Sequence, residues 1–243
     1  MPNPQILHFK KFTAHPTRQL LFKVKWAQLA ETIDLHGLKI LDFGSGFGTT
    51  ASYLAQHNDV TAIEPNPEML ELRETDNEYK QIQGGYANLA EFANGTFDLI
   101  ICHNVLEFAA ENDERVAIVK EFSRLLKSGG VLSIIKNNST GRVIQKALQN
   151  DFDGATALLD GSSIGNAFGT VAIYDHNQLT KWGDGLKIEK NLTAGAFIML
   201  NSHPDDNISA EQLDKMFALE MKVSNMEAYH SFSLLHHVIL RKK

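Results

Sequence analysis

The sequence predicts an α/β fold built around a doubly wound, mostly parallel β-sheet. Between residues 39 and 135, short apolar segments of strand length alternate with segments whose apolar residues recur at helical spacing. The first short segment runs directly into a glycine-rich turn, Gly44-Ser45-Gly46-Phe47-Gly48. Right-handed crossovers between parallel strands place the loops that follow the strands along one edge of the sheet. Ligands bind at that edge in open α/β sheets.

The elements follow in order along the first half of the chain. An N-terminal helix is predicted over residues 18–33, where apolar residues have helical spacing. Five strands are predicted at residues 40–43, 60–64, 81–83, 97–103 and 131–135, with helices at 51–54, 67–72 and 115–126 between them. The last of these helices should stop at Ser128-Gly129-Gly130, because glycine commonly ends helices.

After residue 138 the pattern weakens. Helices are predicted at 140–149 and 177–182, and strands at 187–192 and 233–240. Ser209 begins a further helix, with Gln212 completing a capping box. The glycine- and serine-rich segment 154–169 is either a mobile lid or an irregular surface loop, and its place in the order favours the lid. We expect one domain over 1–243, with an N-terminal helical cap (1–36), a cofactor-binding core (37–137) and acceptor-side lid segments (138–185 and 197–230).

Composition narrows the class of protein. The 243 residues are 43% hydrophobic, which is enough for a substantial core. The net charge of −6 argues against nonspecific nucleic-acid binding, although a local basic patch could still serve tRNA. Cys102 is the only cysteine, and no signal peptide or membrane-spanning run is apparent, so a reducing, cytoplasmic setting is expected. We expect no metal site, since His236 and His237 alternate across a predicted strand and no other cluster has ligand spacing.

The glycine turn is flanked by acidic residues. Asp42 precedes Gly44, Ser45, Gly46 and Gly48, and Glu64 ends the second strand twenty residues beyond Gly44. A carboxylate at the end of the second strand can accept hydrogen bonds from both ribose hydroxyl groups. NAD would bring a pyrophosphate next to Asp42, whereas S-adenosylmethionine (AdoMet) brings a sulfonium and an ammonium. The G-x-G-x-G spacing also differs from the dinucleotide G-x-G-x-x-G, so the sequence favours AdoMet over NAD and over a structural turn without a ligand.

Three more residues are candidates for the same site. Asn88 follows the third strand, where an amide can bind the adenine amino group, although it could equally be a turn residue. His103 ends the fourth strand, facing the expected methionine portion, although a lone histidine is more often structural. Arg18, on the N-terminal helix, could bind the methionine carboxylate, with an exposed helix arginine as the alternative.

Together these features resemble a known family. Asp42 to Gly48, Glu64 and the segment 98–135, including Leu125-Leu126-Lys127-Ser128-Gly129-Gly130-Val131-Leu132, resemble class I AdoMet-dependent methyltransferases of the methyltransferase-11 type. The resemblance covers residues 38–137. It implies the seven-stranded, Rossmann-like methyltransferase sheet, with an antiparallel last strand near residues 233–240.

A narrower resemblance extends over most of the chain. The segments 103–108, 136–138 and 150–152, with Arg18-Gln19 and Trp26, resemble the tRNA 5-carboxymethoxyuridine carboxyl methyltransferases. It implies cofactor contacts at Arg18, Gly44, Glu64, Asn88 and His103. Glu64 stands where relatives usually have aspartate, and Gly195-Ala196-Phe197 stands where they tend to have Gly-x-Arg. An arginine there could help to hold an acidic acceptor, so its absence leaves open whether tRNA is the acceptor.

The expected activity is direct transfer of the AdoMet methyl group to an acceptor, with S-adenosylhomocysteine (AdoHcy) as product. The acceptor is either a small metabolite or a modified tRNA uridine. A carboxylate acceptor would need no general base. His103, His176 and Glu107 could each serve as a base for another acceptor, but we favour structural or cofactor-binding roles for them and assign no catalytic residue. The alternative is a non-catalytic module that binds AdoMet or AdoHcy. The sequence does not indicate an oligomeric state.

Overall fold

The computed structural model describes residues 3–109, 111–162, 164–166, 169–198 and 208–243. Its main sheet has seven strands in the order β3-β2-β1-β4-β5-β9-β8. The strands are β1 (Lys39–Phe43), β2 (Asp59–Glu64), β3 (Lys80–Gln83), β4 (Phe97–His103), β5 (Leu126–Asn137), β8 (Leu186–Ala194) and β9 (Leu235–Lys242). The first five are parallel, and β9 lies antiparallel between β5 and β8. This is the predicted seven-stranded sheet with an antiparallel last strand.

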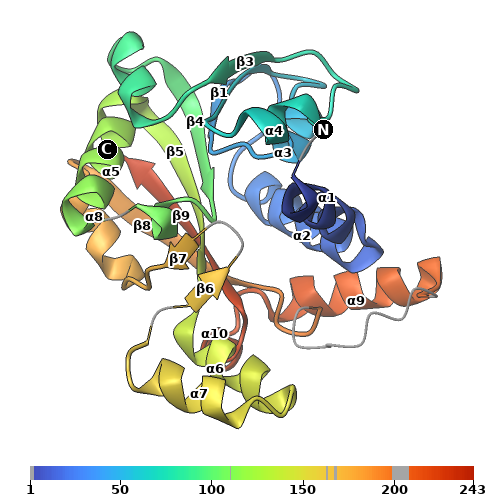
Figure 1. The fold of residues 1–243 in the computed structure, drawn as a ribbon. Coiled ribbons are helices and arrows are strands. Elements are labelled where there is room, and N and C mark those ends of the chain that lie inside the picture. Colours follow the sequence, from blue (N-terminus) through green and yellow to red (C-terminus); the bar gives the residue numbers. More distant parts are fainter. Residues whose placement is uncertain (1–2, 110, 163, 167–168, 199–207) are drawn as a thin grey trace.

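Helices cover both faces of the sheet (Figure 1). They are α1 (Pro4–Ala14), α2 (Pro16–Ala30), α3 (Thr49–Leu54), α4 (Pro67–Glu71), α5 (Asn112–Leu125), α6 (Ser139–Leu148), α7 (Phe152–Leu159), α8 (Leu179–Trp182), α9 (Ala210–Val223) and α10 (Glu227–His230). Three short 3₁₀ helices join them: η1 (Tyr86–Glu91), η2 (Leu106–Phe108) and η3 (His176–Gln178).

The core lies in two layers on either side of the sheet. In β4, Ile100 and Cys102 pack with Phe122 of α5 and Trp182 of α8, whereas Leu99 and Ile101 pack with Leu29 of α2 and Leu54 of α3. Successive side chains of a strand point to opposite faces, so a strand that is buried on both sides must be apolar throughout. The continuous apolar run 99–102 reflects this two-sided burial.

Two sequence predictions differ from the structure near Gly129 and Gly130. The helix ends at Leu125, and β5 begins at once at Leu126, five residues before the predicted strand. Leu126 pairs with Phe97, and the register shifts before Leu99 pairs with Val131. Gly129 has φ +78°, so the glycine pair forms an irregularity inside the strand rather than a loop before it.

The helical prediction at the N-terminus was also incomplete. Two helices precede the sheet where one was predicted, because Pro16 starts α2 at a helix N-terminus and separates it from α1. His15 accepts the cap hydrogen bond from the Thr17 N–H. The helix predicted at 140–149 and the capping box of Ser209 and Gln212 are confirmed.

The segment 154–169 is not an irregular loop throughout. Residues up to Leu159 form α7, and β6 (Ile164–Asn166) pairs with β7 (Gly169–Val171) in a separate hairpin. Residues 163 and 167–168 lie outside the described residues. Asp151 caps α7 by accepting from the Gly154 N–H, so Gly154, one of the glycine residues that suggested a loop, lies in the first turn of a helix. Below the sheet, α6 and α7 lie together (Figure 1).

A buried carboxylate holds the loop after β8. Glu220 of α9 accepts hydrogen bonds from the backbone N–H groups of Ala196 (3.0 Å), Phe197 (2.7 Å) and Ile198 (2.9 Å). This loop is the place where the sequence has no Gly-x-Arg. Its amide groups instead bind a carboxylate from α9, which fixes the direction in which the chain leaves the sheet. Among the helices that the structure describes, none is long and apolar enough to cross a membrane.

Candidate cofactor site

The glycine turn lies at the carboxyl end of β1, at the centre of the sheet. The N–H groups of Gly44 and Ser45 donate to the Ile63 carbonyl at 2.8 and 3.0 Å, which ties the turn to β2. Gly44 has φ +75°, and a Cβ there would lie 2.3 Å from Cγ2 of Val105. Gly48 has φ +73°, and a Cβ there would lie 2.0 Å from the Tyr79 hydroxyl oxygen. Backbone conformation and packing within the protein therefore already require glycine at both positions.

Glu64 connects the end of β2 to this turn. One carboxylate oxygen accepts from the Gly46 N–H at 2.8 Å, and the other accepts from the Asn66 N–H at 2.9 Å. Burial raises the pKa of Glu64, and these two hydrogen bonds oppose that rise. Each oxygen keeps a further lone pair, so the carboxylate can accept two more hydrogen bonds from a diol.

Asp42 and Lys25 are two buried groups of opposite charge beside the turn. Asp42 is 3% exposed and Lys25, from α2, is 4% exposed. Burial raises the pKa of Asp42 to about 7, opposed by the charge of Lys25, and burial lowers the pKa of Lys25 to about 8, opposed by Asp42. In the described part of the chain no ion pair joins them, and Oδ2 of Asp42 has no hydrogen-bond partner.

Lys25 was not among the predicted site residues. It could have been found from its position on the apolar face of a helix, since Leu21, Lys25 and Leu29 follow one another at intervals of four residues. Lysine is seldom fully buried without a partner, so such a position deserves a functional interpretation.

His103 ends β4 beside these groups. Its Nε2 lies 2.8 Å from Oγ of Ser133, and its buried Nδ1 has no partner among the described residues. Burial lowers the pKa of His103 well below its ordinary value, and the charge of Lys25 lowers it further. His103 is therefore neutral at physiological pH. Oδ2 of Asp42 and Oγ of Ser45 are likewise buried without a hydrogen-bond partner in the described part of the chain.

A cavity of about 200 Å³ opens next to the turn, at the ends of β1 to β4. Its lining is mostly apolar and comprises Phe43, Gly44, Ile63, Pro65, Gly84, Gly85, Tyr86, Val105, Phe108, Ala109, Glu114 and Ile118. Each of the first four strands or the loop that follows it contributes to this lining.

Part of the chain matches a known protein family. Residues 41–134, less than half of the chain, match the family model described as a methyltransferase domain. The sheet order and the antiparallel β9 are those of the class I methyltransferase fold.

Individual proteins resemble this chain to different extents. The cypemycin N-terminal methyltransferase from a Streptomyces species is 30% identical over 112 residues, which is 44% of this chain and 44% of that protein. A structure of a putative S-adenosylmethionine dependent methyltransferase from Listeria monocytogenes has a TM-score of 0.58 at 13% identity, covering 93% of this chain and 99% of the other. A Methanosarcina mazei SAM-dependent methyltransferase has a TM-score of 0.56 at 16% identity, covering 88% and 96%.

Asn88 lies on the turn after β3, as the sequence predicts. The Asn88 carbonyl oxygen accepts from the Gly85 N–H at 2.9 Å, and its amide donates to Glu91 at 2.8 Å. Both ends of the side chain therefore stabilise η1. The neighbouring Gly85 and Tyr86 line the cavity, so Asn88 shapes the cavity wall through this turn.

Arg18 lies in a different environment from Asp42 and His103. Its guanidinium carbon is 4.2 Å from the centre of the Phe12 ring. Burial lowers the pKa of Arg18 to about 10, with a further contribution from the charge of Arg142 in α6. Lys25, two helix turns further along α2, is instead the cation whose charge acts on Asp42 and His103.

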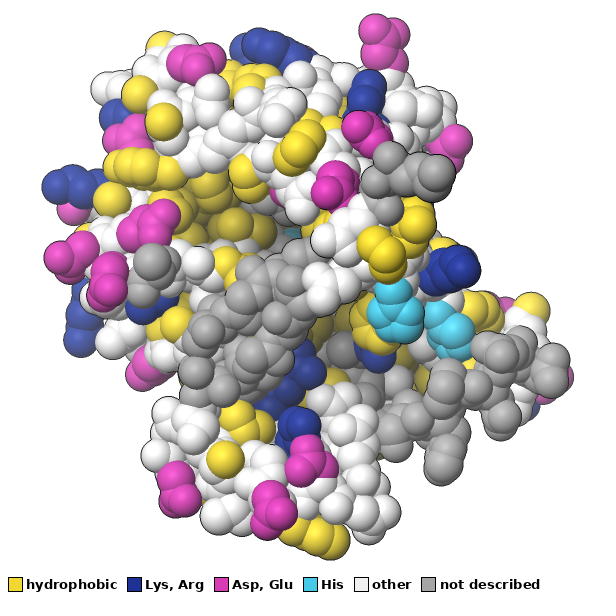
Figure 2. Space-filling view, viewed as in Figure 1, with side chains coloured by type: hydrophobic (Ala, Val, Ile, Leu, Met, Phe, Trp, Pro, Cys, Tyr) yellow, Lys and Arg dark blue, Asp and Glu magenta, His cyan; other side chains and the backbone are white. Residues whose placement is uncertain are grey.

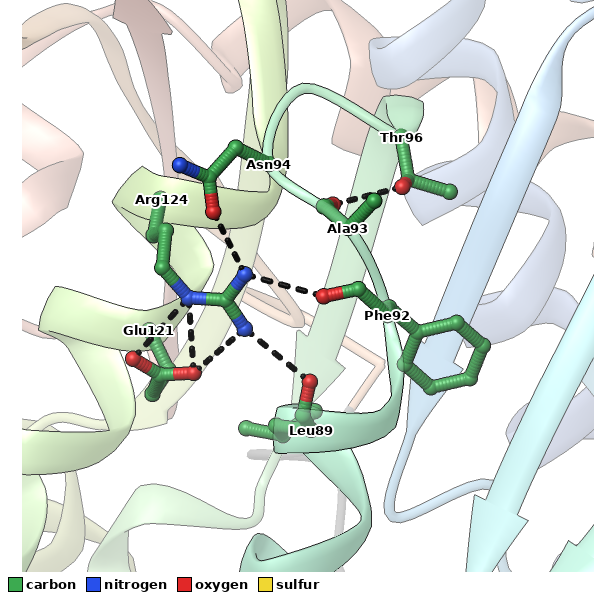
Figure 3. Close-up of polar contacts among 7 residues, drawn as sticks. All are labelled: Leu89, Phe92, Ala93, Asn94, Thr96, Glu121 and Arg124. Carbon is green, nitrogen blue, oxygen red and sulfur yellow. Dashed lines mark hydrogen bonds and ion pairs between the residues drawn. The ribbon is translucent and has the colours of Figure 1, made fainter.

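Arg124 secures the segment between η1 and β4 (Figure 3). From α5, its guanidinium donates to the Leu89 carbonyl (3.1 Å), the Phe92 carbonyl (2.9 Å) and Oδ1 of Asn94 (2.8 Å). Glu121, one turn earlier, holds the same guanidinium at 2.7 Å. One planar group thus binds three acceptors in the turn that follows the cavity wall.

We expect Arg124→Lys to lower the free energy of unfolding by about 2 kcal/mol, because an ammonium cannot reach the separate acceptors that the guanidinium binds. Urea unfolding of both proteins measures the difference. Arg73→Lys is the matched control: Arg73 is exposed and donates to one carbonyl, that of Leu70, so a change of less than about 0.5 kcal/mol is expected. Equal effects at the two positions would contradict the role given to Arg124.

Proposed function

We propose that this protein is an AdoMet-dependent methyltransferase. The observation that carries the proposal is a set of complementary groups at the carboxyl ends of the strands. Lys25 supplies a buried cation, whose Nζ lies 4.1 Å from the centre of the Phe22 ring. Oδ2 of Asp42 and Nδ1 of His103 are buried and have no hydrogen-bond partner among the described residues. An amino acid in zwitterionic form has a carboxylate for the first and an ammonium for the other two. AdoMet joins such an amino acid to a nucleoside, and its sulfonium supplies an electrophilic methyl group.

The neighbouring features suit the nucleoside. The apolar slot between Pro65, Tyr86 and Val105 accommodates a flat base, and the free lone pairs of Glu64 suit the two ribose hydroxyl groups. Asp42 directly precedes Phe43 and Gly44, which line the slot, and a carboxylate there favours a positively charged ligand over a phosphate. We propose that Gly44, Ser45, Gly46 and Gly48 contribute the backbone of this binding surface, and that Asn88 supports its wall.

The chain contributes position and water exclusion to the transfer. Buried groups that hold the cofactor in one orientation turn an encounter of two molecules into a reaction within one complex. A methyl acceptor that is already anionic needs no proton removed. We therefore assign no general base.

The acceptor site is proposed beyond the end of β5. Lys136 is 4% exposed and lies 5.0 Å from the centre of the Tyr174 ring, and Arg142 donates to Oδ1 of Asn137 at 2.7 Å. In the described residues neither cation forms an ion pair with a carboxylate, although the charge of Glu107 acts on both. Figure 2 shows Lys and Arg side chains gathered in the hollow between the sheet and the α6–α7 unit. Such a site favours an acceptor that carries an acidic group.

Both acceptor classes meet this requirement. An acidic modified uridine in tRNA is consistent with the narrower family resemblance, and an acidic metabolite is consistent with the net charge of −6 and with the loop after β8, which lacks Gly-x-Arg. We propose that segments 138–185 and 197–230 cover this acceptor. Residues 163, 167–168 and 199–207 of these segments lie outside the described residues.

Transfer of label from tritiated AdoMet tests the proposal. The protein is incubated with bulk tRNA from cells that lack it, and separately with a metabolite extract. Label in tRNA supports a nucleic-acid acceptor, and label in small molecules supports a metabolite. Binding of AdoMet without transfer to either would support the alternative, a non-catalytic module, and would overturn the enzymatic proposal.

Cofactor binding should depend on pH in a bell-shaped manner. Asp42 must be deprotonated to hold the ammonium, so affinity rises as pH increases through about 7; Lys25 must be protonated to hold the carboxylate, so affinity falls above about 8. Calorimetry with AdoHcy should therefore give the tightest binding between these values. Asp42→Asn should remove the acidic limb and Lys25→Met the basic limb. Constant affinity from roughly pH 6 to pH 9 would contradict both assignments.

A further inference from the structure

Three buried side chains connect α2 to the candidate cofactor site through the sheet. Gln28 of α2 lies 2.8 Å from Nδ1 of His237 in β9, whose Nε2 lies 2.8 Å from Oγ of Ser133 in β5. The same Ser133 oxygen lies 2.8 Å from Nε2 of His103 in β4. We call Gln28, His237 and Ser133 the tautomer relay.

The strand register explains why these groups meet. Ile135 of β5 pairs with both His103 and His237, so both histidines share a face of the sheet with Ser133, two residues before Ile135. This is the face covered by α2, which brings Gln28. Gln28, Ser133 and His237 are all fully buried, so no solvent competes for their hydrogen bonds.

The orientation of the Gln28 amide sets the direction of every hydrogen bond in the relay. The Gln28 amide nitrogen lies 2.7 Å from the Thr193 carbonyl oxygen, which can only accept. The opposite amide orientation would place two acceptor oxygens in contact, so the Gln28 oxygen must face His237. His237 therefore carries its proton on Nδ1.

The remaining hydrogen bonds of the relay run from His237 through Ser133 to His103. His237 is neutral, because burial and the charge of Lys25 lower its pKa to about 3, so its Nε2 has a lone pair and accepts from the Ser133 hydroxyl. The Ser133 oxygen must then accept from His103 Nε2–H. Since His103 is also neutral, its Nδ1 carries a lone pair and no proton.

We propose that the tautomer relay positions His103 so that its Nδ1 accepts a hydrogen bond from the ammonium of the cofactor's amino-acid end. The role in binding rests on the proposed function, whereas the tautomer is a property of the protein alone. The Nδ1 atom is buried and unpartnered within the described residues, and the charge of Lys25 acts on His103. Asp42 of β1 pairs with Ile101 of β4, two residues before His103, so the Asp42 and His103 side chains share a face of the sheet. The opposite tautomer would present an N–H to the ammonium and would repel it.

Nuclear magnetic resonance of the ligand-free protein tests the tautomer. With 15N-labelled histidine, long-range 1H–15N correlation spectra identify which ring nitrogen carries the proton. We expect His103 to carry it on Nε2. Ser133→Ala removes the acceptor for that proton, and should give a mixture of tautomers or the Nδ1–H form.

Calorimetry on the same variants tests the role in binding. Ser133→Ala should weaken AdoHcy binding about tenfold, the effect of one hydrogen bond to a charged group. Binding of 5′-methylthioadenosine, which keeps the nucleoside but has no amino-acid end, should not change. Ser133→Thr keeps the hydroxyl and should restore both the tautomer and the affinity. Ser123→Ala removes another buried hydroxyl, which donates to the Asp184 carbonyl outside the site, and should affect neither.

Gln28→Met breaks the relay at its far end and should also alter the His103 tautomer, even where Ser133→Ala fails to fold. The proposal is overturned if wild-type His103 carries its proton on Nδ1, if both variants leave the tautomer unchanged, or if the two ligands lose affinity equally. Wild-type protein that binds neither ligand, while His103 carries its proton on Nε2, would overturn the proposed function and the role in binding but would support the tautomer assignment.

Discussion

Replacement of Glu64 by alanine is expected to weaken AdoHcy binding about 100-fold or more. The carboxylate is proposed to accept both ribose hydroxyl groups, and hydrogen bonds to a charged acceptor are each worth about 1.5–3 kcal/mol. The same oxygens hold the Gly46 and Asn66 N–H groups, so the substitution also releases the glycine turn. Isothermal titration calorimetry with AdoHcy measures the loss directly.

Two further variants, at the two ends of β2, serve as controls for the loss of ribose binding. Glu64→Gln keeps one carbonyl oxygen as an acceptor and should lose less affinity than alanine. Asp59→Ala removes an exposed carboxylate from the opposite end of the same strand and should leave binding within about twofold of wild type. Unchanged AdoHcy affinity in Glu64→Ala would remove the main support for a ribose-binding carboxylate and for AdoMet as the ligand.

Gly44→Ala is expected to lower the free energy of unfolding by about 3 kcal/mol and to weaken cofactor binding at least about tenfold. The positive φ of 75° disfavours alanine, and the added Cβ would lie 2.3 Å from Cγ2 of Val105. Because Val105 lines the cavity, relief of the clash moves that side chain within the proposed adenine slot. Urea unfolding and AdoHcy calorimetry measure the two effects.

Gly37→Ala is the matched control for backbone strain. Gly37 has a similar φ of +69°, but no atom lies within 4 Å of the Cβ that alanine would add. It should lose only about 1–2 kcal/mol and keep full affinity. In the double variant Gly44→Ala/Val105→Ala, the destabilisation should be less than the sum of the single variants, since the clash is removed. Strict additivity would show that Val105 is not the group that excludes a side chain at position 44.

Much of the architecture was predictable because local patterns and burial agree. The strand predicted at 97–103 has the same bounds as β4, and its apolar residues are buried on both faces of the sheet. The boundary at Leu126 was not predictable, because Ser128-Gly129-Gly130 has the composition of a turn while its backbone is held inside β5 by pairing with β4. Of the two alternatives for segment 154–169, the irregular loop was wrong for a similar reason, since the glycine and serine content hid a capped helix and a hairpin.

Some residues of the candidate site could be predicted from the sequence, and others could not. Asp42, Glu64 and the glycine turn could be recognised because their positions follow from the strand ends, which the sequence marks. Lys25 could not be assigned, because the two groups on which its charge acts, Asp42 and His103, are distant in sequence and come near it only when α2 packs on the sheet. The tautomer relay was equally hidden: Gln28 and His237 are separated by 209 positions.

The sequence alone determined the α/β class, the strand-to-helix turn with its three glycines and the two carboxylates beside it. These features are encoded by neighbours along the chain, through period, turn chemistry and the residue at the end of each strand. Tertiary structure decided which cation lies beside Asp42, which nitrogen of His103 carries its proton, and how Glu220 holds the loop after β8. Burial and hydrogen bonds between distant segments set these properties, and they exist only when the helices pack against the sheet.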